Sequence, residues 1–237
     1  MFKPDLVSII LPCYNESGNI VPLIEAIHAE LYFCSHQIVV VDDNSPDGTF
    51  ELVKSLNYNF VKPVLHATDP SLAKSIRTGI EEADGDVCIV MDSDFNHQPK
   101  YLPQMIHNLE YYDCVSATRF VYGGKMDKIW RHHFSWIFNI FVRLMTGGEI
   151  TDSLYGFFAI KKEFLLKTNY NKIFWGYGDY YIRLLYYLQK VNISILQIPA
   201  INGERLNGAG NSSFMKVFWQ YFKEVLMLFW RERITGK

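Results

Sequence analysis

The sequence predicts an α/β fold in which a mostly parallel central sheet is flanked by helices, and two observations predict it. Short apolar runs at 6–11, 38–41 and 87–91 have the β-branched composition of strands that are covered on both faces. Helical patterns lie between these runs, so strands and helices alternate along the chain. This alternation implies right-handed crossovers and a doubly wound sheet.

The helical patterns place apolar side chains at the spacing of one helix face. The first runs over 20–31, with Ser17 or Asn19 as its expected N-cap. The pattern of strands and helices is less regular in the second half of the chain. We expect further helices at 72–83, 99–110, 131–146, 161–168, 179–189 and 214–231, and strands at 113–118 and 193–198.

Composition limits the class of protein. A chain of 237 residues fits one domain, and a formal net charge of -2 gives no basic field that would indicate a nucleic-acid partner. The four cysteines, Cys13, Cys34, Cys88 and Cys114, show no metal-ligand spacing, which is typical of reduced thiols in a cytosolic protein. We expect no signal peptide and no membrane-spanning helix, because no apolar run reaches ~18 residues.

Polar side chains follow each of the three strand-like runs. Tyr14 and Glu16 follow the first run, Asp42 and Asp43 end the second, and Asp92 ends the third. A single Asp after a strand is usually a turn or cap residue. Ligands of open parallel sheets bind outside the carboxyl ends of the strands, so three polar clusters at that edge favour a binding site.

Two carboxylates that are two residues apart, Asp92 and Asp94, are expected to turn into the same cleft. Their charges repel each other unless a cation lies nearby, and hard oxygen ligands suit Mg²⁺ or Mn²⁺. A nucleotide diphosphate needs such a cation to neutralise its leaving charge. A carboxylate at Asp42 or Asp43 is suited to accept hydrogen bonds from a base or ribose, whereas residues 45–49 are interpreted as a turn and helix cap.

Several stretches in consistent order resemble family 2 glycosyltransferases with the GT-A fold, and most closely the dolichyl-phosphate or polyprenyl-phosphate mannose synthases. The matching segments are LPCYNESGNI (11–20), VVVDDNSPDGT (39–49), MDSDFNHQPKYLP (91–103), ATRF (117–120), DSLYGFFAIKKEFL (152–165), ILQIPA (195–200) and ER (204–205). The resemblance covers about residues 5–213, and the joint order and spacing of the motifs is specific.

The resemblance implies donor-site roles for residues in these motifs. Residues that match positions holding the base and ribose are Pro12, Tyr14, Glu16 and Asp43, with Asp42 as a close neighbour. Asp92 matches the residue facing the donor, Asp94 matches the metal-binding residue of the DxD motif, and Asn96 falls where a second metal ligand is found. Mg²⁺ or Mn²⁺ is the expected cofactor.

The resemblance also implies roles near the reacting groups. Arg119 matches a basic residue near the phosphates, and Arg205 matches an arginine on a loop that closes over the donor. Arg131 and Ser135 open the aromatic helix and are expected to meet the phosphate of an acceptor. Asp152 is the candidate general base or acceptor-positioning residue, with a helix cap as the alternative reading.

The sequence departs from the family pattern at several positions. Ser71 and Ala73 stand where glycine is usual, and Phe158 stands where an arginine is expected. Asp179 stands near a position where the family has glutamate, and the loop after Arg205 is longer than usual. These departures concern the identity of the sugar and the acceptor rather than the general class.

The chain is expected to form a single glycosyltransferase domain over 1–237. It comprises a nucleotide-sugar-binding half (5–120), an acceptor-side half (121–213) and a C-terminal amphipathic helix (214–237). Aromatic residues with flanking Arg and Lys crowd 129–145 and 214–230, which favours peripheral contact with the cytoplasmic face of a membrane. Packing on the core or a homodimer contact is the alternative.

The predicted function is inverting transfer of a sugar from a GDP- or UDP-linked donor to a polyprenyl or dolichyl phosphate or another lipid-linked acceptor. The alternative is a soluble transferase that extends a polysaccharide or glycoprotein glycan, whose hydroxyl acceptor would require a base at Asp152 or Asp179. A nucleotidyltransferase is disfavoured, because no glycine-rich loop follows the first strand. The intact DxD motif argues against a non-catalytic binding module, whereas the altered arginine and glycine positions keep this alternative open.

Overall fold

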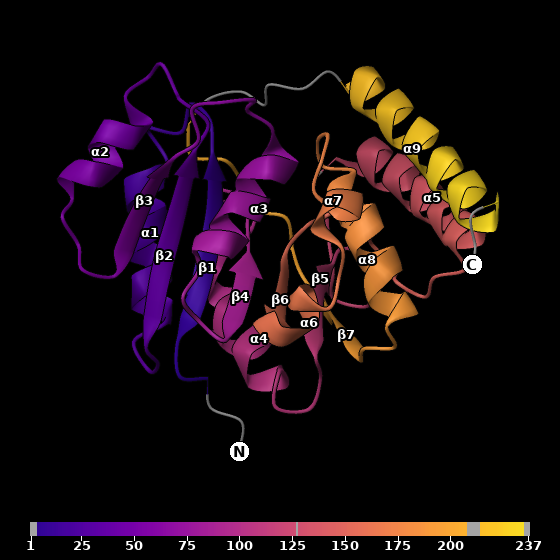
Figure 1. Ribbon diagram of the computed structural model, residues 1–237, viewed down its shortest axis with the longest axis horizontal. Coiled ribbons are helices and arrows are strands. Elements are labelled where there is room, and N and C mark those ends of the chain that lie inside the picture. The colour runs from indigo at the N-terminus through magenta and orange to yellow at the C-terminus, as the bar shows by residue number, and fades with distance from the viewer. Residues whose placement is uncertain (1–3, 127, 208–213, 235–237) are drawn as a thin grey trace.

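The central feature of the computed structural model is a mixed seven-stranded sheet. The model describes residues 4–126, 128–207 and 214–234, and within them the strand order is β3-β2-β1-β4-β6-β5-β7 (Figure 1). The strands are β1 (Val7–Cys13), β2 (His36–Asp42), β3 (Val61–Leu65), β4 (Val87–Val90), β5 (Cys114–Thr118), β6 (Phe158–Lys161) and β7 (Ile195–Pro199). Strands β3, β2, β1 and β4 are parallel, β6 is antiparallel to both of its neighbours, and β5 and β7 are parallel. The predicted mostly parallel sheet is therefore confirmed.

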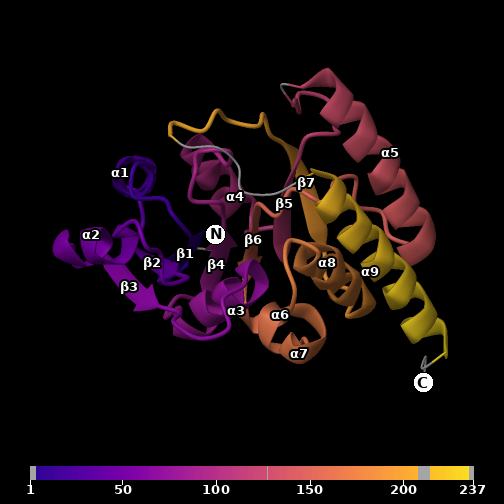
Figure 2. The same ribbon diagram turned by 90° about the horizontal axis from the view of Figure 1, so that it is seen from above.

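Helices cover both faces of the sheet. They are α1 (Ile20–Glu30), α2 (Thr49–Ser55), α3 (Leu72–Glu82), the 3₁₀ helix η1 (Pro99–Tyr101), α4 (Leu102–Asn108), α5 (Ile129–Thr146), α6 (Lys162–Leu166), α7 (Tyr170–Ile173), α8 (Tyr180–Lys190) and α9 (Phe214–Ile234). From above, α1 and α4 lie on one face and α3, α6 and α7 on the other (Figure 2). Helices α5 and α9 lie outside these layers, beyond α8 (Figures 1 and 2).

The alternation of side chains along β1 divides the core into two layers. Ile9 and Leu11 belong to the apolar cluster that includes α1 and α4, whereas Ile10 belongs to the cluster with Ile76 and Ile80 of α3. All five of these strand and helix residues are buried, with at most 1% of each exposed. Strand β1 is thus covered on both faces, which is why its sequence is continuously apolar rather than alternating.

A third apolar cluster joins α9 to α5 and α8. Its buried members are Phe138, Val142, Ile182, Val225 and Leu228. The rings of Phe141 and Phe222 stack at 5.1 Å between α5 and α9. None of the helices within the described residues is long and apolar enough to cross a membrane.

The structure adds elements that the sequence did not predict. Strand β3 is an edge strand whose residues are half-buried except for the exposed Leu65. It tolerates Pro63, since the edge of a sheet does not require every backbone N–H. Strand β6 lies between β4 and β5, so a segment from the predicted acceptor half completes the sheet of the nucleotide-binding half. The helix expected at 161–168 is shorter, because β6 extends to Lys161 and the helix ends at Leu166.

The N-cap residue of α1 is one of the two that were predicted, but it does not cap the helix through its side chain. Asn19 occupies the N-cap position, but its side chain makes no capping hydrogen bond. The side-chain Nδ2 of Asn19 instead donates to Glu16 Oε2 at 2.6 Å, and its side-chain Oδ1 accepts from the backbone N–H of Asn207 at 2.9 Å. This residue therefore joins the start of α1 to the segment at 204–207. The Gly- and Ser-containing loop that follows lies largely outside the described residues.

Candidate active site

A cavity of about 580 Å³ opens at the carboxyl ends of β1, β2 and β4. Of the predicted donor-site residues, those that line it are Pro12, Tyr14, Glu16, Asp43, Asp92, Asp94 and Arg205. These residues come from four separate segments, and the parallel strands bring three of the four segments to one edge. The structure therefore brings together most of the site that the strand-end argument predicted.

The paired carboxylates form the acidic part of this cavity. Asp94 is buried, and its two oxygens accept hydrogen bonds from the backbone N–H (3.0 Å) and side-chain amide (2.7 Å) of Asn96. Asp92 is half-buried, and removal from bulk water raises its pKa to about 6, against the opposing effect of Arg119 and Arg205. The pKa of Asp94 is raised by burial and then by the charge of Asp92. Two neighbouring carboxyls with raised pKa values are a site that a cation would stabilise.

His97 is a buried residue that stabilises the turn carrying Asp92 and Asp94. Its Nδ1 accepts a hydrogen bond from the backbone N–H of Asp92 at 2.8 Å, and its ring stacks on Phe157 at 4.8 Å. Burial lowers its pKa to about 3, so the ring stays neutral and Nδ1 stays an acceptor. This histidine lies inside the predicted motif at 91–103, but no feature of the sequence indicated its role.

The residues present fit a divalent cation that is shared with a diphosphate. Asp92 and Asp94 supply hard oxygen atoms at the cavity wall, which Mg²⁺ and Mn²⁺ prefer. No group of three or more His, Cys, Asp or Glu side chains within the described parts of the chain is arranged to hold an ion. Asn96, the predicted second ligand, directs its amide nitrogen to Asp94, and its oxygen accepts from Asn202 at 3.2 Å. The geometry therefore favours Asn96 as a support for Asp94 rather than as a ligand.

Arg205 reaches across the cavity to two carboxylates. Its guanidinium is hydrogen-bonded to Glu16, and its Nη1 lies 3.5 Å from Asp94 Oδ2. Burial raises the pKa of Glu16, while Asn19 and Arg205 oppose this shift. Arg205 thus lies beside the acid pair, at the end of the segment where the family resemblance placed it.

The neighbouring aspartates at the end of β2 have different surroundings. Asp43 lines the cavity, and its Oδ1 accepts hydrogen bonds from His66 Nδ1 at 2.7 Å and from the hydroxyl of Ser75. Asp42 is fully buried, and both of its oxygens accept from Ser45, each at 2.7 Å. The carboxylate of Asp42 therefore shapes the turn, and Asp42 does not line the cavity, so its predicted contact with the nucleotide stays a prediction.

A second cavity, of about 210 Å³, lies between α5 and α9. Its lining combines Arg119, Arg131 and Ser135 with apolar side chains that include Phe134, Phe138 and Phe218, and no carboxylate belongs to the described residues that line it. Hereafter this cavity is called the arginine groove and the larger one the donor cavity. The sequence predicted Arg119 near the donor phosphates, whereas the structure places it in the lining of the arginine groove.

Asp152 is buried directly behind Arg119. Its Oδ2 accepts from Arg119 Nε at 2.8 Å and from the backbone N–H of Arg119 at 3.1 Å, and its Oδ1 accepts from Nη2 at 3.0 Å. The Tyr155 ring packs on the same guanidinium, with its centroid 4.7 Å from Cζ. With no exposed surface and both oxygens engaged, Asp152 is positioned to orient Arg119 rather than to accept a proton from an acceptor.

Asp179, the second candidate base, is also engaged. Its Oδ2 accepts from Arg183 Nη1 at 2.5 Å, and its Oδ1 accepts from the backbone N–H of Tyr177 at 2.9 Å and from Gln220 Nε2 at 3.0 Å. Only 1% of Asp179 is exposed. Both carboxylates that the sequence offered as a base are therefore buried and paired with an arginine.

Comparisons with known proteins agree with this geometry. The model of glycosyl transferase family 2 matches residues 8–168. A dolichol-phosphate mannosyltransferase of Pyrococcus furiosus is 29% identical, and the match covers 94% of this chain and 63% of that protein. The chain thus spans less than two thirds of the Pyrococcus protein. The enzyme of the same name from Saccharomyces cerevisiae is 29% identical, over 94% of this chain and 86% of its own.

Solved structures share the fold. Glucosyl-3-phosphoglycerate synthase from Mycobacterium tuberculosis, in complex with Mn²⁺ and UDP-glucose, superposes with a TM-score of 0.72 and 16% identity, over 95% of this chain and 79% of that one. Its complex with Mg²⁺ and UDP gives a TM-score of 0.68 and 17% identity, over 97% and 79%. With the predicted fold and the predicted family both confirmed, the chain belongs to glycosyl transferase family 2 and has the GT-A fold.

Proposed function

We propose that this protein transfers a sugar from a nucleotide-diphosphate donor to a polyprenyl phosphate at a membrane surface. The observation that carries the proposal is the arginine groove, which offers cations and apolar side chains to an acceptor but no carboxylate among its described lining residues. A phosphate needs cationic partners and its lipid chain needs apolar ones. The dolichol-phosphate mannosyltransferases that the chain resembles support the same acceptor class.

The donor cavity is suited to a nucleotide diphosphate sugar. Asp43 offers an oxygen to a base or ribose at the end of β2, and Asp92 and Asp94 lie at the end of β4. Asp92 and Asp94 would hold Mg²⁺ or Mn²⁺, which supplies positive charge for the departing diphosphate. Structural neighbours that were solved with Mn²⁺ or Mg²⁺ and UDP support this arrangement. Arg205, beside Asp94, adds a second positive charge.

In the proposed reaction an oxygen of the acceptor phosphate forms a bond to the anomeric carbon. The bond between that carbon and the donor phosphate breaks, and its electron pair leaves with the nucleoside diphosphate. Attack from the opposite face inverts the anomeric configuration. No proton has to be removed, because a phosphate monoester is already an anion near neutral pH.

A hydroxyl acceptor, the alternative from the sequence, is disfavoured by the same residues. A sugar hydroxyl must lose a proton during attack, which requires a positioned base. Asp152 accepts three hydrogen bonds from Arg119, and Asp179 is held by Arg183, Gln220 and the backbone of Tyr177. Both are buried, and both would have to give up an arginine to act as the base.

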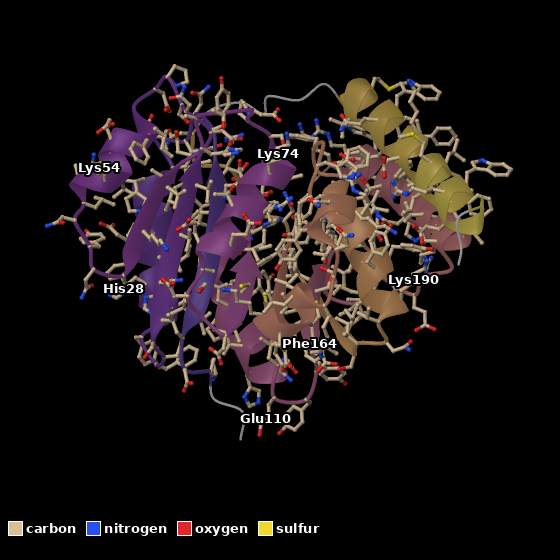
Figure 3. All side chains as sticks on the ribbon, viewed as in Figure 1. His28, Lys54, Lys74, Glu110, Phe164 and Lys190 are labelled. Atoms are coloured by element: carbon tan, nitrogen blue, oxygen red, sulfur yellow. The ribbon has the colours of Figure 1, made fainter. Side chains whose placement is uncertain are left out.

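We further propose that α5 and α9 rest on the lipid surface. Both helices present large apolar side chains that are about half exposed or more, namely Ile129, Trp130, Trp136, Ile137, Leu144, Met215, Trp219, Met227 and Trp230. Figure 3 shows side chains that project from the outer side of α9, away from the body of the molecule. The arginine groove lies between the same two helices, so a lipid phosphate would reach it without leaving the surface. Four free cysteines are consistent with the reducing, cytoplasmic side of the membrane.

The test is transfer of radiolabelled sugar to two lipids that share one polyprenyl chain, polyprenyl phosphate and the corresponding polyprenol. Labelled donors with different bases are supplied with Mn²⁺ in mixed micelles. We expect radiolabelled sugar to be transferred to polyprenyl phosphate and not to the polyprenol. Arg131→Ala is expected to raise the acceptor KM, whereas Arg77→Ala, on α3 and paired with Glu81, serves as the matched control. Transfer to the polyprenol at a similar rate would overturn the proposal.

A further inference from the structure

Two residues, Leu154 and Tyr221, line both the donor cavity and the arginine groove. Leu154 comes from the loop before β6, and Tyr221 comes from α9. Under the proposed function the sugar donor occupies one cavity and the acceptor phosphate the other. The reacting atoms would therefore meet at the wall that these two side chains form.

Buried polar contacts on either side of Tyr221 fix this part of α9. Gln220 donates to Asp179 at 3.0 Å, and Glu224 lies 3.1 Å from Arg183 Nη1, so two contacts one helical turn apart anchor α9 to α8. Arg183 has no exposed surface and Glu224 is 2% exposed. Breaking a buried ion pair is costly, so these contacts hold α9 against α8.

The Tyr221 side chain packs closely against Gly178, and this contact places it between the two cavities. A methyl group at this glycine would lie 1.9 Å from the Tyr221 hydroxyl oxygen and 3.2 Å from the ring carbon that bears it. Any larger side chain at this position would displace the ring. The backbone at Gly178 comes directly before Asp179, so the anchor of α9 and the contact with Tyr221 belong to one segment.

The opposite side of α9 faces away from the site. Trp219 is 52% exposed, and residues two apart on a helix point to opposite sides. The helix that we propose to lie on the lipid surface therefore also supplies a side chain to the wall between the cavities. The family match ends at residue 168, well before this helix.

We propose that Tyr221 is a positioning residue that separates the donor from water and from the empty part of the groove until the acceptor phosphate arrives. The inference rests on the proposed function. Without the ring, water would reach the anomeric carbon: its oxygen would bond to that carbon, the nucleoside diphosphate would leave with the electron pair, and the proton would pass to solvent. Loss of the wall should therefore increase hydrolysis of the donor relative to transfer.

The experiment measures donor hydrolysis without acceptor and transfer to polyprenyl phosphate, for wild type, Tyr221→Ala, Gly178→Ala and Gly178→Ala/Tyr221→Phe. We expect the ratio of hydrolysis to transfer to rise about tenfold in both single variants, because both open the wall. The double variant should bring the ratio back toward wild type, because removing the hydroxyl leaves the ring carbon at 3.2 Å as the nearest atom. Tyr111→Ala, at a tyrosine that is 68% exposed and lines neither cavity, is the control.

A ratio in Tyr221→Ala equal to that of wild type would overturn the inference, and so would a double variant no better than Gly178→Ala. Circular dichroism and thermal unfolding establish that each variant folds. If Tyr221→Ala does not fold, the comparison of Gly178→Ala with the double variant still decides the question. Wild-type protein that hydrolyses the donor but transfers nothing to the lipid phosphate would refute the proposed function. The hydrolysis rates of the variants would then still report on the wall.

Discussion

The donor cavity and the arginine groove differ in how they are built and in the charge that they offer. The donor cavity takes its acidic residues from loops at strand ends, where Asn96 fixes Asp94 locally and the more distant His66 and Ser75 hold Asp43. The groove takes Arg119 from the segment directly after β5 and Arg131 from α5, and Asp152, buried behind Arg119, orients the guanidinium of Arg119. Carboxylates thus gather where a cation is expected and arginines where an anion is expected.

The comparison also shows how one residue type serves opposite purposes. Asp92 and Asp94 line the donor cavity, and burial raises the pKa values of both carboxyl groups. Asp152 and Asp179 are more deeply buried, and each is paired with an arginine. The position of an aspartate in a sequence motif does not distinguish these roles. They are distinguished by the hydrogen-bond and ion-pair partners of the side chain.

The largest effect is expected from the donor side. Asp94→Ala should lower transfer by ~10²–10³-fold, because the departing diphosphate loses the group that holds its neutralising charge. Initial rates at saturating Mn²⁺ measure the effect. Asp84→Ala is the matched control, since its side chain is 67% exposed and lies outside the cavity lining. A variant that keeps most of the wild-type rate would show that the acid pair does not carry the reaction.

The next effect distinguishes positioning from proton transfer at Asp152. Asp152→Asn should lower the free energy of unfolding by about 3 kcal/mol, because Arg119 is then buried without a counter-charge. Urea unfolding measures this, with Asp69→Asn, at an exposed ion pair with Lys74, expected to cost less than about 1 kcal/mol. If stability is unchanged while transfer collapses, Asp152 is a base after all and the contrast between the two regions fails.

The smallest effect concerns the outer face of α9. Trp219→Ser should weaken binding to vesicles that contain anionic lipid by about tenfold, as expected for loss of one partly buried indole ring. Binding of the nucleotide should not change. Tyr32→Ser, at a tyrosine that is 86% exposed beyond the end of α1, is the control in a flotation assay. Equal vesicle binding, together with a wild-type dimer that Trp219→Ser dissociates, would instead identify this face as a contact between two copies.

The sequence predicted which residues the fold gathers around the donor cavity, because the signals for them are local. Apolar runs such as 87–91 end in charged residues, and the parallel sheet brings those ends together without any further information. Strand β6 was not predicted, because four residues between Gly156 and α6 become a strand only through pairing with β4 and β5. The sequence could not distinguish Asp42 from Asp43, because a carboxylate that folds back onto Ser45 has the same local sequence as one that points into a cavity.

The acceptor side was less predictable because its contacts join distant segments. Arg119 and Asp152 lie 33 residues apart, and no pattern in either segment pairs them. Tyr221 lies on a helix whose sequence indicates only an amphipathic surface, and its place between the cavities depends on contacts with Gly178 and the Asp179 segment. The contacts of Asp43 with His66 and Ser75 could not be predicted for the same reason. His66 follows β3 and Ser75 lies in α3, so both are distant from Asp43 in the sequence.

The central claim, that donor and acceptor are held by oppositely charged sites, is tested most directly by calorimetry on three proteins. UDP, GDP, ADP and CDP are titrated into wild type, Asp94→Ala and Arg131→Ala, with and without Mn²⁺. We predict that wild type binds one of these nucleotides in a metal-dependent manner, that Asp94→Ala loses this binding, and that Arg131→Ala retains it. Loss of nucleotide binding in Arg131→Ala, or metal-dependent binding that survives in Asp94→Ala, would contradict the division of the site.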